Sequence, residues 1–417
     1  MDKAERRRER LARLLDLAQT YRGWTRKELA RALRRDPTKL IPGSGIPKLD
    51  LVIDLAGVLD WSVEDVVTLF WEQPDEEDGP AGTSPADFEA IDATMRDAHG
   101  EGRYGLLVTL AERAYEVAET AEQRALACNR EAGGWDGLGR YQNAMKAIHR
   151  GLRETPVSGE LRRVLQSNLA NAYYSIWSLV EAKAIAGDLV HRFDAVPAES
   201  RRDHWTAAFC RYVLGHTHRR LLGTEPDDLQ VNAALARRHL ESAIAGYRDL
   251  AEAEKNNSLL GIARTCEGGL IEIDAAVGDL DPREALARIH ARIEEADEAG
   301  ERLGGDELES VGWWCIFGCN IALRSIDEER ELQKHMAVFT NKADEIADRL
   351  DSWAIRERVF TMEHARWERA VGCTGFEIPC VVDEEDVRVI TGTMARYPTF
   401  RDTGWRILNS AKVVGRD

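Results

Sequence analysis

From residue 87 onward the sequence repeats one pattern, in which apolar residues recur at the spacing of an α-helix. Short polar stretches break the pattern at intervals, and no segment before residues 379–382 alternates as a strand would. A chain of successive amphipathic helices must bury each apolar face against its neighbours. The pattern therefore predicts an all-α fold in which helix pairs stack along the chain.

Residues 139–156, GRYQNAMKAIHRGLRETP, carry the most regular of these patterns. They resemble the second helix of a tetratricopeptide repeat, with small residues where helices approach and larger ones between them. The matching positions are Gly139, Tyr141, Ala144, Ile148, Leu152 and Pro156, preceded by Cys128, Ala132 and Trp135 on the partner helix. Later matches are Leu169, Ala170, Tyr173, Leu179, Ala182 and Ala186, then Leu240, Ala243 and Tyr247, and more weakly Ala285 and Ile289.

The resemblance implies an α-solenoid with a concave surface, because a single helix pair cannot bury its apolar face alone. We predict this tetratricopeptide-like domain over residues 87–371. Beyond residue 372 the pattern changes, and residues 372–417 are predicted to cap the last repeat. Residues 72–86, EQPDEEDGPAGTSPA, are rich in Pro, Gly and acidic residues and are predicted to be a flexible acidic linker.

The chain ahead of this linker is basic, although the whole protein has a net charge of −17. Residues 1–50 hold 14 Lys and Arg against 7 Asp and Glu, which leaves 42 against 66 in the remainder. A basic head on an acidic body favours contact of the head with a polyanion. Thr25 and Glu28 form a predicted capping box that starts a helix in this head.

Residues 25–67 resemble the XRE/Cro-type helix-turn-helix family. The resemblance rests on TRKELA from Thr25, on Gly43 and Pro47 in the loop, on LDLVIDLA from Leu49 and on LDWSVEDV from Leu59. It implies a small N-terminal helix-turn-helix bundle over residues 1–71 that binds duplex DNA. Asp36 and Pro37 can begin a recognition helix, which Pro42 stops after little more than one turn.

The basic residues of this region are the predicted DNA contacts. Arg34 and Arg35 are expected to read base edges, since arginine pairs with guanine in bidentate geometry. The others are expected to position the duplex or to reach the groove from the short helix. The predicted set is Arg22, Arg26, Lys27, Arg34, Arg35, Thr38, Lys39 and Lys48.

A helix-turn-helix head joined to a tetratricopeptide body resembles the RRNPP type of peptide-responsive regulator. That resemblance implies a cytoplasmic homodimer whose solenoid binds a peptide or protein effector and alters how its heads sit on DNA. The alternative is an interaction scaffold whose head contacts proteins and binds no DNA. Effector contacts are expected on the first helix of each pair, at Asn129, Asp136, Ser167, Asn171, Tyr174, Arg211, Tyr212, His216, Trp313 and Asn320.

No residue pattern in the sequence indicates an enzyme. The phosphate-binding GxxxxGK[ST], the nucleophile motif GxSxG and the zinc motif HExxH are all missing. The seven cysteines are scattered and form no CxxC pair, which favours buried thiols over a metal site. We therefore predict no catalytic residue, no metal and no cofactor. No run of about 18 apolar residues is present, so no membrane partner is expected.

Overall fold

The computed structural model describes residues 3–43, 46–59, 61, 63, 66–67, 87–300, 303–374 and 380–414. The chain divides into two compact units, Met1–Pro85 and Ala86–Asp417, and each has its own hydrophobic core. The predicted linker over residues 72–86 lies outside the described residues. Among the described helices, none is both long enough and apolar enough to cross a membrane.

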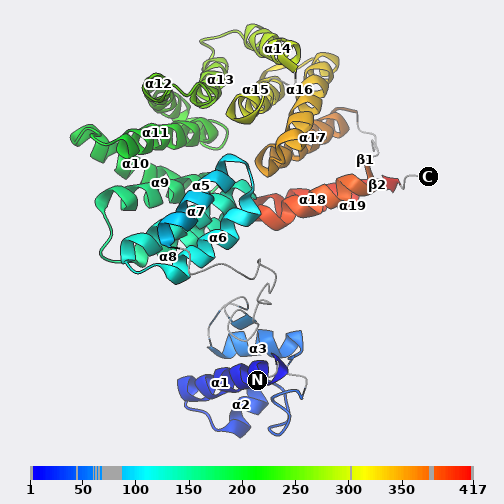
Figure 1. Ribbon diagram of the computed structural model, residues 1–417. Coiled ribbons are helices and arrows are strands. Elements are labelled where there is room, and N and C mark those ends of the chain that lie inside the picture. The colour runs from blue at the N-terminus through cyan, green and yellow to red at the C-terminus, as the bar shows by residue number, and fades with distance from the viewer. Residues whose placement is uncertain are drawn as a thin grey trace. The chain divides into compact units, whose positions relative to one another are not determined.

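The first unit is a small helical bundle around a leucine-rich core (Figure 1). Its described helices are α1 (Lys3–Arg22), α2 (Arg26–Ala32) and α3 (Leu49–Leu59). The predicted capping box is confirmed, because the Glu28 amide donates to the Thr25 hydroxyl and the Thr25 amide donates to the Glu28 carboxylate. Leu29, Leu33 and Leu55 are fully buried and join the helices.

The second unit is built almost wholly from helices that pack as successive antiparallel neighbours, which confirms the all-α solenoid (Figure 1). The helices are α5 (Phe88–Gly100), α6 (Tyr104–Val117), α7 (Ala121–Gly137), α8 (Tyr141–Arg153), α9 (Gly159–Ser175), α10 (Leu179–Ala195), α11 (Arg201–Leu221), α12 (Leu229–Glu254), α13 (Leu259–Val277), α14 (Pro282–Ala299), α15 (Gly305–Ser325), α16 (Glu329–Leu350) and α17 (Trp353–Thr374).

Each odd-numbered helix from α5 to α17 contacts both its even-numbered neighbour and the next odd-numbered helix. This is the packing expected of stacked helix pairs, and it lines one face of the stack with odd-numbered helices. Small residues permit the close approach. A Cβ at Gly151 would lie 3.0 Å from the Cβ of Cys128 on the neighbouring helix. Ala144 and Ile148, which matched the repeat pattern, are buried in the same contact region.

The C-terminal segment does more than cover the last repeat. It contains β1 (Cys380–Asp383), α18 (Glu384–Arg396), α19 (Arg401–Ser410) and β2 (Ala411–Val414), with β1 and β2 paired in parallel. Arg396 Nε donates to the Leu138 carbonyl at 3.1 Å, and the rings of Tyr397 and Tyr141 pack 5.7 Å apart. The segment therefore joins the last helices to the turn between α7 and α8, so that the solenoid closes on itself (Figure 1).

Candidate ligand site and nucleic-acid interface

The odd-numbered helices enclose a groove made of adjoining cavities. The central cavity has a volume of about 400 Å³ and is lined mainly from odd-numbered helices, namely α5, α7, α9, α11, α13, α15 and α17, with further residues from α8 and α12 and with Tyr397. A second cavity of about 210 Å³ shares His99, Asp136, Asn171 and Phe209 with it. A third, of about 170 Å³, shares Arg220 and Trp313 with it. The three adjoin one another at these shared residues, and we call them together the interior groove, whose aromatic lining is typical of ligand sites.

One end of the groove is lined by side-chain amides from α7 and α9. Asn168 Nδ2 donates to Asn129 Oδ1 at 2.9 Å, and Asn171 Nδ2 donates to Asp136 Oδ1 at 3.2 Å. An amide side chain carries two N–H donors and a carbonyl oxygen with two lone pairs. Each of these asparagines therefore keeps hydrogen-bonding capacity that a ligand entering the second cavity can use.

The middle of the groove holds three carboxyl groups. Burial and the neighbouring Glu309 carboxyl raise the pKa of Asp136 to about 7. Burial also raises the pKa of Asp306 and that of Glu309, although Glu309 accepts a hydrogen bond from Trp313 Nε1 at 3.1 Å. Burial raises the pKa of the Tyr104 hydroxyl, and the same three carboxyl groups raise it further.

Arginines line the end of the groove opposite to the asparagines. The Arg220 guanidinium lies 3.7 Å from the centre of the Tyr174 ring and 4.1 Å from that of Trp177, and it donates to the Tyr174 carbonyl at 2.5 Å. Arg358, from α17, lies 4.7 Å from the Trp177 ring centre. Stacking on aromatic faces stabilises a guanidinium without neutralising its charge. This end of the groove is therefore positively charged and suits a carboxylate or another anionic group.

Most of the predicted effector contacts line the groove. These are Asn129, Asp136, Asn171, Tyr174, Tyr212, Trp313 and Asn320. Three others lie elsewhere. Ser167 is buried and donates to the Val164 carbonyl of its own helix. Arg211 forms an ion pair with Asp194 at 2.7 Å and lines a different groove. His216 is fully buried and accepts from Arg219 Nε at 3.1 Å.

The groove that contains Arg211 lies between α10, α11 and α12 and is larger, at about 1260 Å³. Its floor is made of small residues, including Ala208 and Gly246, and its rim is charged. Glu254 on this rim is already held by Arg201 and by Trp205 Nε1, at 2.7 and 2.6 Å. The interior groove is the better candidate because its polar groups retain unused bonding capacity.

Asp306, Glu309 and Arg220 also line the groove, although no pattern in the sequence indicated them. Asp306 and Glu309 stand in the first turns of α15, where acidic residues are ordinarily explained by the helix dipole. Arg220 belongs to a run of basic residues at the end of α11, which has the same explanation. Only the three-dimensional closure of the solenoid brings α15 opposite α7, so no local signal identified these residues.

The raised pKa of Asp136 predicts a specific dependence of stability on pH. A carboxyl whose pKa is about 7 when folded and near 3.8 when unfolded stabilises the fold most at low pH. That contribution is lost as the pH rises from about 4 to about 7. The stability of Asp136→Asn relative to the wild type should therefore rise by about 4 kcal/mol across this window and by nothing further above pH 8. Urea unfolding of both proteins from pH 4.5 to 8.5 measures this difference, and a constant difference would contradict it.

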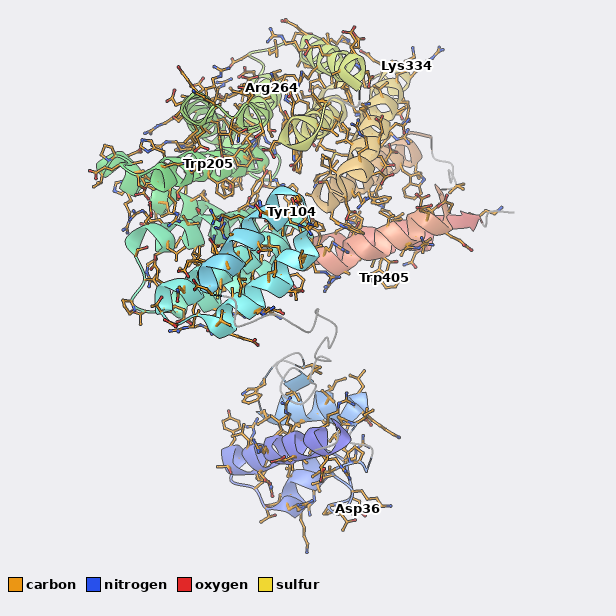
Figure 2. The ribbon with its side chains drawn as sticks, viewed as in Figure 1. Asp36, Tyr104, Trp205, Arg264, Lys334 and Trp405 are labelled. Carbon is orange, nitrogen blue, oxygen red and sulfur yellow. The ribbon has the colours of Figure 1, made fainter. Side chains whose placement is uncertain are left out.

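In the first unit, the expected recognition helix is missing from the described residues. Residues 33–43 form turns instead of the short helix predicted after Asp36 (Figure 2). The Asp36 carboxylate accepts from both the Thr38 amide and the Thr38 hydroxyl, at 2.8 and 2.6 Å, which closes a turn. The same local bonding that caps a helix also stabilises a turn, and Pro42 follows too soon for helical bonds to form.

The two arginines predicted to read bases are held by α3. Arg34 makes a two-pronged contact with Asp54, at 2.5 and 3.2 Å, and Arg35 pairs with Asp50 at 2.5 Å. The Asp50 pKa is lowered by the hydrogen bond from Arg35. Asp50 and Asp54 are four residues apart and face the same side of α3, so they fix both arginines against it. Base reading by these arginines would require both contacts to break.

The remaining predicted DNA contacts divide into two groups. Arg22 donates to the Val58 carbonyl at 2.7 Å and Arg26 to the Pro37 carbonyl at 3.1 Å, so both support the bundle itself. Lys27, Lys39 and Lys48 are exposed and have no ion pair with any described residue. Unpaired surface ammonium groups of this kind suit phosphate contacts, which position a duplex without reading its sequence.

Comparison of the sequence with protein-family models and with curated proteins gives no match. Among solved structures, the chain is similar to a Rap protein complexed with Competence and Sporulation Factor, with a TM-score of 0.46 and 11% identity over 96% of each chain. It is also similar to PlcR of Bacillus thuringiensis in complex with the peptide PapR7 and DNA, with a TM-score of 0.31 and 12% identity over 84% of this chain and 99% of that one.

Proposed function

We propose that the second unit binds a short peptide, or an extended segment of a partner protein, along its interior groove. The adjacency of the three cavities supports this proposal, because successive cavities lined by amides, carboxyls and arginines suit a chain of peptide groups. Asparagine side chains can donate to a peptide carbonyl and accept from a peptide N–H at once. The protein is then a regulator whose ligand alters the state of the helical unit.

The proposal predicts that replacement of the groove asparagines abolishes peptide capture. The full chain is incubated with a randomised library of free octapeptides, and retained peptides are sequenced. Wild-type protein should enrich a defined sequence class, and Asn168→Ala with Asn171→Ala should reduce its retention at least tenfold, since two sets of buried bonds are lost. Asn257→Ala, in an exposed turn outside the groove, is the matched control. Equal enrichment by all proteins, or none, would contradict peptide binding.

We also propose that the first unit binds duplex DNA, chiefly through its phosphates. The excess of basic residues in the first 50 positions and the free ammonium groups of Lys27, Lys39 and Lys48 support this proposal. The fixed positions of Arg34 and Arg35 favour low sequence selectivity, because direct readout needs side chains in the groove. The rival is a scaffold in which this unit contacts a protein instead of DNA.

Charge reversal at the exposed lysines distinguishes DNA binding from the scaffold alternative. Lys27→Glu with Lys39→Glu should weaken binding of a fluorescent duplex at least tenfold at 50 mM salt. It should also reduce the slope of log affinity against log salt by about 2, since about one counterion is released for each phosphate contact. Lys334→Glu, the same substitution at one exposed lysine on α16 of the second unit (Figure 2), is the control. A duplex affinity that none of these variants alters would favour the scaffold.

A homodimer is the assembly proposed for this regulator. Two-fold symmetric regulators place their two reading units about one DNA turn apart, roughly 34–36 Å, so ligand-dependent changes in the body can change DNA affinity. Light scattering of the full chain at micromolar concentration should give about twice the mass of one chain, 46.8 kDa. A single-chain mass, with and without the selected peptide, would contradict this assembly.

A further inference from the structure

The central cavity contains three carboxyl groups, which binding to a peptide backbone alone does not require. We infer that it receives a cationic group of the ligand, a protonated amine or a guanidinium, between the carboxyls of Asp136, Asp306 and Glu309. This inference rests on the proposed function, since it assigns the ligand's chemistry at the middle of the same groove.

The three carboxyls lack a cationic partner. Within the described residues, Asp136 is contacted by the Asn171 amide and Glu309 by the Trp313 indole, and none of the three has an ion pair. His99 lines the same cavity and interacts with Asp306, but burial and Arg130 lower its pKa, which disfavours the charged imidazolium that could balance these carboxyls. Three acidic groups in one enclosed space repel each other when ionised and favour a bound cation.

Two other buried carboxylates of this protein each have an arginine partner. Glu272 is buried, and it is paired with Arg219 at 2.5 Å and with the Asn320 amide at 3.1 Å. Glu131 is also buried, and Arg150 pairs with it. A carboxylate that only supports the fold is thus matched by an arginine from a neighbouring helix. Asp136, Asp306 and Glu309, which line the central cavity, have no such arginine among the described residues.

Aromatic rings form the rest of the wall. Phe209, Tyr212, Tyr247 and Trp313 come from α11, α12 and α15 and line the same space. The negative face of an aromatic ring attracts a cation, most strongly where water is excluded. Carboxyls combined with several rings recognise an ammonium or guanidinium group better than a neutral or anionic one. The stacked Arg220 at the far end of the cavity shows that this protein holds a guanidinium against such rings.

The Tyr397 hydroxyl is a further polar group on the cavity wall. Tyr397 is 1% exposed, and its hydroxyl makes no hydrogen bond of normal geometry with any described residue. Burial and an interaction with the Tyr141 hydroxyl raise its pKa. One weak neighbour leaves lone-pair capacity on the Tyr397 oxygen, which a ligand in the adjoining cavity can use. A bound N–H group can donate to this oxygen.

Agmatine, which carries a guanidinium and an ammonium but no carboxylate, is a suitable probe. Titration calorimetry of the full chain at pH 7.5 should detect agmatine binding and no binding of 1-pentanol. Asp136→Asn with Glu309→Gln should weaken agmatine binding at least tenfold. Asp306→Asn, a single change in the first turn of α15, should weaken agmatine binding at least threefold. This variant provides a second test in case the double variant does not fold. Glu295→Gln, exposed on α14, is the control and should bind agmatine as the wild type does.

Peptide libraries then identify the source of the cation. Enrichment of Lys or Arg at one position assigns the site to a side chain, and loss of capture on N-terminal acetylation assigns it to the α-ammonium. Either result supports the inference, provided that the Asp136/Glu309 variant removes the preference. Capture of uncharged peptides by wild type and variant alike, without agmatine binding, would overturn it while leaving the proposed function intact. Agmatine binding without any peptide capture would support the cation site and contradict the proposed peptide binding.

Discussion

Replacement of Glu272 by alanine is expected to lower the free energy of unfolding by about 3–5 kcal/mol, because it leaves a buried guanidinium without its counter-charge. Arg219 is 5% exposed, and its NH1 lies 2.5 Å from Glu272 Oε2. Its Nε already donates to His216, and its guanidinium lies 4.5 Å from the Phe317 ring centre. No other carboxylate among the described residues pairs with it. Urea unfolding of the full chain measures the loss.

Two controls separate the buried pair from a general effect of lost charge. Glu267→Ala changes the same helix, but Glu267 forms an exposed pair with Arg248, and its loss should cost about 0.5 kcal/mol or less. Arg219→Met with Glu272→Met removes both charges and should recover much of the stability that Glu272→Ala loses. A cost for Glu272→Ala no larger than that of Glu267→Ala would contradict the network as described.

A methyl group at Gly261 is expected to destabilise the second unit by about 1–3 kcal/mol, because it would overpack the contact between α13 and α15. A Cβ at this position would lie 2.5 Å from the Asp306 carbonyl carbon and 2.6 Å from the Glu307 nitrogen. Backbone atoms cannot rotate away as side chains do, so the first turn of α15 must shift. That turn carries Asp306 and Glu309, so Gly261→Ala should also weaken ligand binding in the groove.

Gly187→Ala is the matched change, since nothing lies within 4 Å of a Cβ at this position in α10. Removing a helical glycine there should stabilise the protein by about 0.5–1 kcal/mol. Thermal unfolding of both variants, with agmatine titration of each, checks the two effects together. Equal melting temperatures for Gly261→Ala and Gly187→Ala would show that α13 and α15 are less closely packed than the structure describes.

The repeat architecture could be predicted from the sequence because its signals are local. Ala144, Ile148, Ala182 and Leu240 recur at helical spacing, and all are buried between neighbouring helices. The capping box of Thr25 and Glu28 is equally local and was predicted correctly. Local bonding could not decide between helix and turn after Asp36, since its side chain accepts the same amide hydrogen bonds in both.

The candidate site could be predicted only in part, because its residues meet through closure of the solenoid. Asn129, Asp136 and Asn171 were found from the face that they occupy on the first helices of adjacent pairs. The acidic groups on α15 that line the same groove are more than 130 positions away, and Tyr397 is farther still. The bond from Arg396 to the Leu138 carbonyl links ends of the domain that no repeat pattern connects. The ion pairs of Arg34 and Arg35 with α3 could not be predicted from a local pattern either, because Asp54 and Asp50 lie 15 or more positions further along the chain.

Location of the ligand is the most direct test of the interior groove. A library-selected peptide carrying a photoreactive benzophenone is crosslinked to the full chain, and the attached segments are identified by mass spectrometry. The account predicts adducts on the groove-lining parts of α7, α9, α11 and α15, including residues 129–136 and 306–313. Adducts confined to the groove around Arg211 and Gly246, between α10, α11 and α12, would contradict it.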